Sequence, residues 1–300
     1  MECKMMTLVV FLVTNFYCTG LNRVPYDIVP QIGKINWDYL LSNKGPIKLI
    51  TINTGKIKVP VSGMLNMKHE KMEGESDRII EVDVLAHLLR HPIKGDILID
   101  TGFDSSFSGK NRGNLSGVFL SNYVKGFSQN EGQDIASQLK VYKADPKAVL
   151  FTHLHSDHTS GVPALNQNIP LFAGKDAEYI NVPLLYSNTH FENNNKIKEI
   201  DCKQAIYSSE AGSVIDFYGD NSLFILCTPG HSKGHLSYLI LTQEGPVLLV
   251  GDVSHTKKGF IEGIEPGWVS DRALAVQSLN NLKQFVNKYN QVKVIYGHEI

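Results

Sequence analysis

The chain has 300 residues, of which 42% are hydrophobic and 20% are charged, so it is long enough to bury a full core. Its 29 basic residues are balanced by 30 acidic ones. This balance excludes the overall basic excess that is typical of nucleic-acid-binding proteins, and we expect no nucleic-acid partner.

The N-terminus predicts export. Residues 5–17 (MMTLVVFLVTNFY) are an apolar run that follows Lys4, as in a signal peptide. The run is shorter than the roughly 20 residues that a membrane-spanning helix needs. We interpret residues 1–20 as a signal peptide or N-terminal anchor, with Cys18 as a candidate lipid-attachment site; a buried N-terminal strand or helix is the alternative. The protein would then be periplasmic or secreted, and any membrane association would occur through this leader alone.

Two cysteines, Cys202 and Cys227, would remain after the leader is removed. A disulfide between them suits an exported protein, but their spacing does not decide between a disulfide and two separate buried thiols. The four cysteines of the sequence lack the Cys-x-x-Cys spacing of a thiolate zinc site.

The rest of the chain predicts an N-terminal arm and one α/β (α+β) domain. Residues 21–46 are interrupted by Pro and Gly and predict an irregular arm, whereas residues 47–300 alternate apolar strands with turns and helices. Strands are expected at 47–61, 81–90, 97–99, 148–151, 169–172, 213–217, 223–226, 236–241, 247–250 and 292–296, and helices at 131–142 and 272–289.

In two stretches of this domain, the apolar residues follow no clear helical or strand period. Residues 103–129 predict a long loop beside the functional site. Residues 174–210 predict an insertion or lid, and His190 within them is interpreted as a solvated surface histidine.

The stretch 152–158 (THLHSDH) holds three histidines and an aspartate directly after an apolar run. Alternate residues of an extended backbone share one side, so His153 and His155 can face one metal ion together. Asp157 and His158, after the turn, can serve a second ion. Because the chain has only 11 histidines, so dense a cluster indicates metal binding rather than a polar loop.

Other candidate ligands also follow apolar strands. Asp100 precedes a turn glycine, His231 lies in the turn TPGHSKGH, Asp252 follows the strand at 247–250, and His298 follows the last strand. Strand ends that converge on one edge of a sheet would explain this recurrence.

The ordered set His153-x-His155-x-Asp157-His158, His231, Asp252 and His298 resembles the ligand pattern of the metallo-β-lactamase superfamily over residues 47–300. The resemblance implies a four-layer αβ/βα sandwich with two zinc ions per chain. It further implies that the first ion is held by His153, His155 and His231, that the second is held by Asp157, His158 and His298, and that Asp252 bridges them. Asp100 and His235 are then expected to orient ligands from behind.

The implied chemistry is hydrolysis. Two ions about 3.5–4 Å apart generate a bridging hydroxide near neutral pH and polarise the substrate carbonyl. Asp157 is also a candidate proton acceptor and donor. His155 stands where the related diiron flavoproteins use Glu, which favours hydrolysis over redox chemistry.

Within the superfamily, the segments TPGHSKGHLS, Gly-Asp-x-Ser and the terminal Gly-His-Glu resemble the N-acyl homoserine lactonase group. This resemblance implies a small-molecule lactone, or a related ester or amide, as substrate. Those lactonases commonly place Tyr three residues after the bridging Asp, where it contacts the lactone oxygen. Here that residue is His255, which we expect to donate a similar hydrogen bond. His255 and Asp157 are therefore the candidate catalytic residues.

Three alternatives stay open at this stage. A β-lactam hydrolase or a thioesterase would use the same fold, and a non-catalytic metal-binding protein is the alternative of another class. The oligomeric state is not predicted.

Overall fold

The computed structural model describes residues 20–31, 33–110, 112–182 and 184–300. Residues 1–19 of the predicted leader, Cys18 among them, lie outside the described residues, so the signal peptide stays a prediction. Within the described ranges, no helix combines the length and apolar character needed to cross a membrane.

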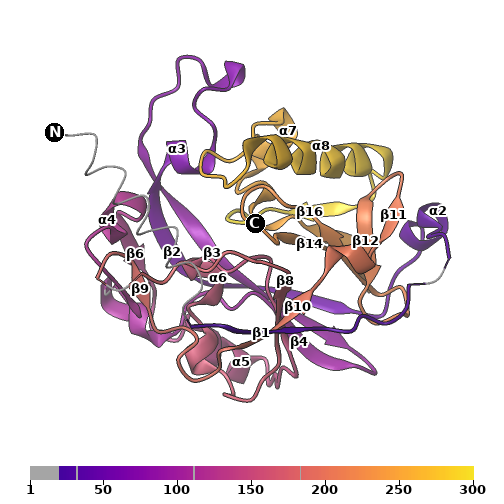
Figure 1. Ribbon diagram of the computed structural model, residues 1–300, viewed down its shortest axis with the longest axis horizontal. Coiled ribbons are helices and arrows are strands. Elements are labelled where there is room, and N and C mark those ends of the chain that lie inside the picture. The colour runs from indigo at the N-terminus through magenta and orange to yellow at the C-terminus, as the bar shows by residue number, and fades with distance from the viewer. Residues whose placement is uncertain (1–19, 32, 111, 183) are drawn as a thin grey trace.

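Two large sheets form the centre of the described chain (Figure 1). The larger has the strand order β1 (Asn22–Pro25), β10 (Lys196–Ile200), β8 (Leu171–Gly174), β7 (Val149–Leu150), β4 (Gly95–Ile99), β3 (Ile79–His91), β2 (Lys48–Pro60) and β6 (Gly126–Ser128). The smaller has the order β11 (Ile206–Ser208), β12 (Gly212–Asp216), β13 (Leu223–Cys227), β14 (Leu236–Thr242), β15 (Gly245–Leu249) and β16 (Lys293–Ile295). Two short strands, β5 (Leu115–Ser116) and β9 (Ser187–Asn188), pair separately.

Helices cover the outer faces of both sheets. Helix α8 (Arg272–Lys288) packs on the smaller sheet and α5 (Ile135–Val141) on the larger one (Figure 1). The remaining helices and 3-10 turns are short: α2 (Trp37–Leu41), α3 (Val61–Met64), α4 (Leu120–Tyr123), α6 (Ser156–Thr159), α7 (Lys257–Glu262), η1 (Glu70–Met72), η2 (Ser105–Lys110), η3 (Val162–Ala164), η4 (Cys202–Gln204) and η5 (Gly251–Val253). The predicted four-layer αβ/βα sandwich is confirmed.

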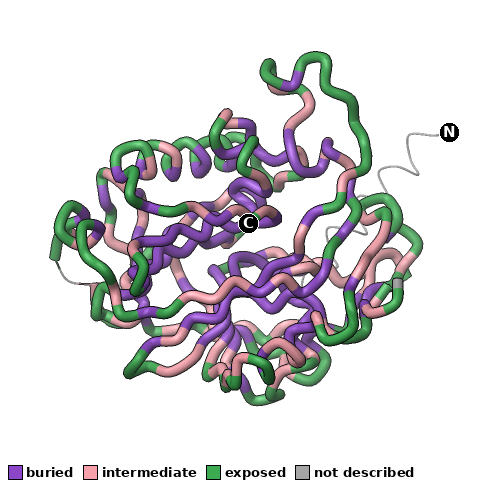
Figure 2. The backbone as a smooth tube through the Cα atoms, turned by 180° about the vertical axis from the view of Figure 1, so that it is seen from behind, coloured by how far each residue is buried: buried purple, intermediate pink, exposed green. Residues whose placement is uncertain are grey.

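Alternation of apolar side chains along the strands produces these layers. In β3, Leu88 faces the cluster under α5, whereas its neighbour Leu89 faces the core between the sheets. In β14, Tyr238 and Ile240 point into that same central core, and Leu239 points to α8. Since successive side chains of a strand point to opposite faces, each sheet buries both of its faces. Figure 2 shows the buried residues concentrated in the two sheets.

Helix α8 begins where the sequence predicts. The Asp271 carboxylate accepts a hydrogen bond from the Leu274 backbone N–H, which satisfies one of the free donors of the first turn. Its apolar residues Ala275, Leu279, Leu282 and Phe285 are buried on one face against the smaller sheet.

The predicted arm contributes more order than its Pro and Gly content indicates. Strand β1 pairs in parallel with β10 at the edge of the larger sheet. Helix α2 buries Trp37 against Phe224 and Phe285 on the outer face of the smaller sheet. Residues 21–46 therefore pack on both sheets. The sequence did not predict this packing, because the apolar residues of this segment stand singly between turn residues.

The two stretches without a period also contain structure. Residues 103–129, predicted as a long loop, include the short elements η2, β5, α4 and β6. Within 174–210, strand β10 lies inside the larger sheet, between β1 and β8, and β9 pairs with β5. Residues 196–200 are thus sheet rather than lid. These strands have two to five residues, too few to show a period.

Candidate metal centre

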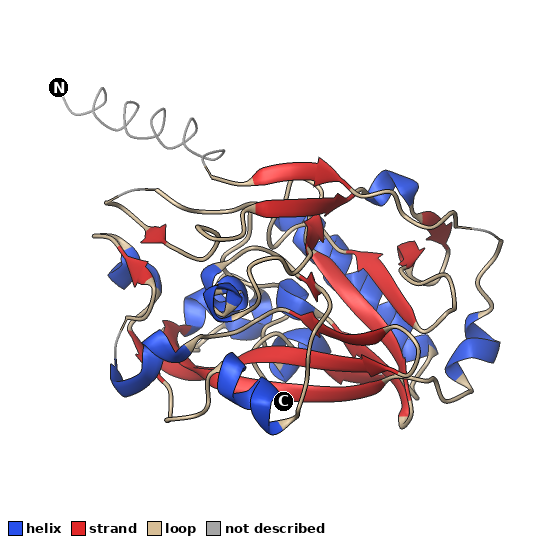
Figure 3. Cartoon of the chain, turned by 90° about the horizontal axis from the view of Figure 1, so that it is seen from below, coloured by secondary structure: helices blue, strands red, loops and turns tan. Residues whose placement is uncertain are grey.

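The candidate ligands lie at the ends of strands that run in parallel. Strands β4 and β7 are parallel neighbours in one sheet, and β15 and β16 are parallel neighbours in the other. Their carboxyl ends therefore reach common edges. Asp100 follows β4, the His153 cluster follows β7, Asp252 follows β15 and His298 follows β16. Figure 3 shows the C-terminus, which directly follows the last candidate ligands, lying beside the long strands.

The first donor set consists of His153, His155, His231 and Asp252, whose donor atoms all lie within 4.8 Å of one another. The Nδ1 atom of His155 is 3.0 Å from Nε2 of His231. Oδ2 of Asp252 lies 3.5 Å from Nε2 of His153 and 3.4 Å from Nε2 of His231. The structure thus brings together the residues expected around the first ion.

The second donor set consists of Asp157, His158 and His298. Nε2 of His298 is 3.4 Å from Oδ2 of Asp157. Asp252 contacts this set as well, because its Oδ1 lies 3.5 Å from Nε2 of His298 and its Oδ2 lies 3.6 Å from Nε2 of His158. Asp252 therefore lies between the two sets, as expected of a bridging ligand.

These residues fit metal ions. Nε2 of His153, Nε2 of His158 and Oδ1 of Asp252 are buried without a hydrogen-bond partner among the described residues. A buried polar atom left unpaired costs about 1–3 kcal/mol, so three such atoms close together need a partner. Imidazole nitrogens and carboxylate oxygens are the donors that zinc takes in proteins.

Asp100 fixes the orientation of two ligands from behind. Its Oδ2 accepts hydrogen bonds from Nδ1 of His158 and from the Thr152 hydroxyl, both at 2.8 Å, and its Oδ1 accepts the Thr152 backbone N–H. Since the Thr152 hydroxyl donates to Asp100, it accepts from Nδ1–H of His153 at 3.0 Å. Both histidines therefore carry a proton on Nδ1 and turn Nε2 toward the donor sets.

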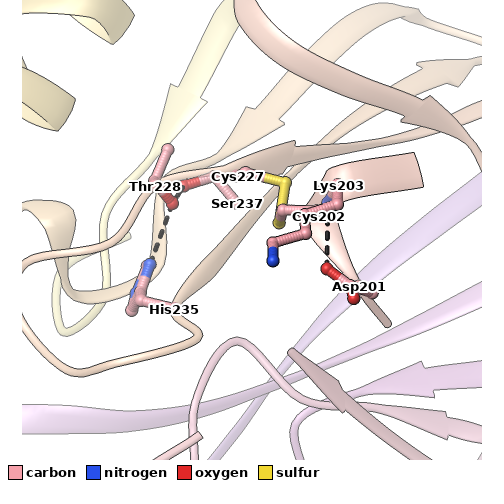
Figure 4. Close-up of a disulfide and its surroundings, with 7 residues drawn as sticks. All are labelled: Asp201, Cys202, Lys203, Cys227, Thr228, His235 and Ser237. Carbon is pink, nitrogen blue, oxygen red and sulfur yellow. Dashed lines mark hydrogen bonds between the residues drawn. A yellow bond between two sulfur atoms is a disulfide. The ribbon is translucent and has the colours of Figure 1, made fainter. Parts of the chain in front are cut away.

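His235 holds the backbone of the bridging residue. Its Nε2 accepts the Asp252 backbone N–H at 3.1 Å, so its Nδ1–H donates to the Thr228 hydroxyl at 2.9 Å. Thr228 in turn donates to Ser237, whose hydroxyl donates to the Val250 carbonyl. Figure 4 shows Thr228, His235 and Ser237 beside the disulfide that ends β13. Each donor in this series of hydrogen bonds has one acceptor, and the series holds the backbone of Asp252 in position.

The electrostatics of the centre favour a cation. Burial by itself lowers the pKa of His158, but the carboxylates of Asp100, Asp252 and Asp157 hold it well above the ordinary value. Burial by itself raises the pKa of Asp252, but the surrounding histidines hold it well below its usual range. Burial and the neighbouring His158 lower the pKa of His153 well below the usual value, so its ring is neutral, as a ligand must be.

Two glycines make room for ligands. A Cβ on Gly297 would lie 2.3 Å from Oδ1 of Asp252. Gly230 has a φ of 136°, and a Cβ there would lie 2.1 Å from the Ala275 backbone nitrogen. Each glycine directly precedes a ligand, His298 or His231, and no larger residue fits either place.

His255 lies inside the centre. Its Nδ1 is 3.1 Å from the Met64 carbonyl oxygen and its Nε2 is 3.1 Å from Oδ2 of Asp252. A carbonyl only accepts, so Nδ1 carries the proton and a neutral ring has no proton on Nε2. The expected hydrogen bond from His255 to a substrate oxygen stays a prediction.

His190 is buried, so its interpretation as a solvated surface histidine is wrong. Its Nδ1 lies 2.8 Å from the Thr159 hydroxyl, and its Nε2 lies 2.8 Å from Oδ1 of Asn114 and 3.0 Å from the Ser160 hydroxyl. Burial lowers the pKa of His190 to about 3. The ring joins residues 174–210 to the helix α6 that carries Asp157 and His158.

Several supporting groups were missed in the sequence. Thr152, Thr228 and Ser237 complete the hydrogen-bond chains, and the Asp83 carbonyl accepts Nδ1–H of His298 at 2.7 Å. Hydroxyl side chains and backbone carbonyls are so common that the residue type alone does not identify them as supporting groups. Thr152 and Thr228 could have been found because each begins one of the two histidine motifs, THLHSDH and TPGHSKGH.

An aromatic row leads from the centre to the surface. The Tyr186 hydroxyl lies 2.5 Å from the hydroxyl of Ser156, the residue between two ligands. The Tyr123 ring packs edge-on against both Tyr186 and Trp268, with centroids 6.1 and 5.5 Å apart. Beside this row is a pocket of about 750 Å³ lined by Arg112, Ser116, Gly117, Val118, Ser121, Leu184 and Ser187.

Comparisons with known proteins agree with this geometry. The family model described as Metallo-beta-lactamase superfamily matches residues 80–298. An N-acyl homoserine lactonase from a Bacillus species is 32% identical over 230 residues, which cover 74% of this chain and 83% of that protein. The N-acyl homoserine lactonase AttM of Azorhizobium caulinodans is 26% identical over 260 residues, which cover 84% of this chain and 93% of that protein.

A solved structure agrees as well. The crystal structure of a variant of the Bacillus thuringiensis protein AiiA, with N-decanoyl-L-homoserine bound at its active site, superposes with a TM-score of 0.63 at 26% identity. The match covers 86% of this chain and 95% of that chain. The predicted resemblance to the lactonase group is therefore confirmed, and the chain belongs to the metallo-β-lactamase superfamily.

Proposed function

We propose that the chain is a dinuclear zinc hydrolase that opens the ring of N-acyl homoserine lactones. The observation that carries this proposal is the pair of donor sets joined by Asp252, in a chain whose relatives over most of its length are named N-acyl homoserine lactonases. The fold and the family alone would leave the substrate open, because one fold hosts many reactions.

His153, His155 and His231 would hold the first ion, and Asp157, His158 and His298 the second, with Asp252 shared. When bound, the two ions supply a nucleophile from water at neutral pH and polarise the carbonyl of the substrate. The chain contributes imidazoles fixed by hydrogen bonds on their far side and an ionised carboxylate between them.

Asp157 is the proposed proton carrier. Of the two carboxylates in the donor sets, its side chain is 20% exposed and that of Asp252 is 3% exposed. Asp157 therefore faces the side from which a substrate enters. We assign to it the transfer of a proton from the attacking water to the ring oxygen that leaves the carbonyl carbon.

The aromatic row supports a substrate with an apolar chain. Val118 and Leu184 line the pocket and are 69% and 83% exposed. Tyr123 and Trp268 extend the apolar surface toward Tyr186, next to the ligand helix α6. An acyl chain laid on these side chains would cover apolar area, which favours binding by about 25 cal/mol per Å².

Export is a separate part of the proposal. The apolar leader predicts it, and the Cys202–Cys227 disulfide supports it, because disulfides persist in oxidising compartments. Mass spectrometry of the protein recovered from the medium or periplasm should find the leader removed or a lipid on Cys18. A full-length chain in the cytoplasm would contradict export without affecting the hydrolase.

The test of function is a substrate panel with the metal-loaded protein. N-acyl homoserine lactones of increasing chain length, β-lactams, thioesters and phosphodiesters are compared by kcat/KM, and we expect the lactones with longer chains to lead. His155→Ala and Asp252→Ala should abolish turnover, whereas Asp96→Asn, at the distant end of β4, should retain it. A preference for β-lactams or thioesters would reassign the substrate. Metal binding without turnover of any member would indicate a non-catalytic metal-binding protein.

A further inference from the structure

His255 turns its Nε2 atom toward the centre. The residue follows η5 and its side chain is 3% exposed. Its Nδ1–H donates to the Met64 carbonyl, which belongs to α3 in the connection between β2 and β3. The ring is therefore held from outside, with Nε2 directed at Asp252.

Nε2 of His255 and Oδ2 of Asp252 are close enough to bind one cation together. The two atoms are 3.1 Å apart, and both present lone pairs when the ring is neutral. A positive charge between them, either a metal ion or a proton on Nε2, is compatible with this spacing. The same short spacing occurs between His155 and His231, at 3.0 Å, in the first donor set.

A third donor set contains this pair. Donor atoms of Asp252, His255 and His298 all lie within 4.8 Å of one another. His298 has one lone pair to give, because its Nδ1–H donates to the Asp83 carbonyl. One lone pair serves one ion, so the set with His255 and the set with Asp157 and His158 share the same ion.

We propose that His255 is a further ligand of the second metal ion, beside Asp157, His158 and His298. This inference rests on the proposed dinuclear centre and adds to it a sixth imidazole. It gives His255 a metal-binding role in place of a hydrogen bond to substrate. It also ties the second ion to the β2–β3 connection, since Met64 orients the ring.

The number of bound imidazoles can be counted directly. The chain is loaded with Co²⁺, and its proton NMR spectrum is recorded in H₂O and in D₂O. Each histidine bound to Co²⁺ gives a strongly shifted N–H signal that disappears in D₂O. We expect six such signals, for His153, His155, His158, His231, His255 and His298, with two Co²⁺ per chain. Five signals with two bound Co²⁺ would overturn the inference and leave the proposed function intact.

Variants assign the sixth signal. His255→Phe keeps a ring but removes both nitrogens, and it should lose one shifted signal and weaken binding of the second Co²⁺ by at least about 10-fold. His91→Gln, a buried histidine outside the donor sets of the described chain, should keep all six signals. An unchanged affinity in His255→Phe would contradict ligation. If that variant does not fold, the wild-type count decides alone; failure of the wild type to bind Co²⁺ would contradict both the inference and the proposed centre.

Discussion

At the scale of single residues, one carboxylate outside the donor sets controls two ligands. Asp100 accepts from His158 and from Thr152, and Thr152 accepts from His153, so Asp100 is linked to one candidate ligand in each donor set. Its backbone has a φ of 57°, a conformation that Asp tolerates better than most residues. A short acidic side chain is therefore suited to this turn as well as to its partners.

Asp100→Asn should weaken metal binding. The amide retains the size of the side chain but loses the charge and one acceptor, so His158 is less firmly oriented. We expect the affinity for the second ion to fall about 10- to 100-fold, measured by competition with a chelator. The matched control is Asp96→Asn in the same strand, whose ion pair with Arg90 lies away from the centre. Equal affinities of the two variants would contradict the role of Asp100.

His190 should make stability depend on pH. Burial holds its pKa at about 3 in the folded chain, whereas an unfolded histidine titrates near 6.5. Between these values the unfolded chain binds a proton that the folded chain does not, so stability falls as pH falls from 6.5 toward 3. The loss is about 1.4 kcal/mol per pH unit, or about 2 kcal/mol at pH 5.

Urea unfolding at pH 7 and pH 5 measures this contribution. The wild type should lose about 2 kcal/mol more between these pH values than His190→Gln, which lacks the titrating ring. The other buried histidines are common to both proteins and cancel in the comparison. A pH dependence equal in the two proteins would show that His190 is not held neutral.

The residues of the donor sets could be predicted from the sequence, but the orientations of their side chains could not. Histidine is rare in this chain, so His153, His155 and His158 together were informative. His190 was misjudged, because its burial depends on Asn114, Thr159 and Ser160, which only the folded chain brings together. The direction of the His255 ring likewise depends on a carbonyl 191 residues away.

At the scale of elements, the disulfide joins the ends of strands from both sheets. Cys202 follows β10 of the larger sheet, and Cys227 ends β13 of the smaller one, directly before Thr228 (Figure 4). Both cysteines pack against the core between the sheets. The structure therefore resolves the alternative that the spacing left open, in favour of a disulfide.

Removing this disulfide should destabilise the fold. The cysteines are 25 residues apart, and closing a loop of that length in the unfolded chain is worth about 3 to 4 kcal/mol. Urea unfolding of the Cys202→Ala/Cys227→Ala variant should show a loss of this size. Dithiothreitol should destabilise the wild type and leave the double variant unchanged. Equal stability of the oxidised wild type and the variant would contradict the cross-link.

Strands with continuous apolar runs were predictable, and short ones were not. The runs that form β13, β14 and β15 are almost wholly buried and stand out in the sequence. Strands β5 and β9 have two residues each and exist because they pair across about 70 positions. Local patterns contain no information about such pairings, which is why residues 103–129 looked like a loop.

At the scale of the whole molecule, the two sheets meet where their ligand-bearing ends lie together. His153, His155 and His158 come from the larger sheet, whereas His231 and Asp252 come from the smaller one. Each donor set therefore forms only when the two sheets pack in the correct relative position. Strand alternation predicted the two sheets, but their relative position followed only from the resemblance to a known family.

The central claim is that activity depends on two bound metal ions, and titration of the metal-free protein tests it most directly. Chelated protein is titrated with Zn²⁺ while the opening of an N-acyl homoserine lactone is followed by acid release. The account predicts no turnover without metal and a rate that rises until two Zn²⁺ are bound per chain. Turnover by the metal-free protein, or full activity at one Zn²⁺ per chain, would contradict the dinuclear centre.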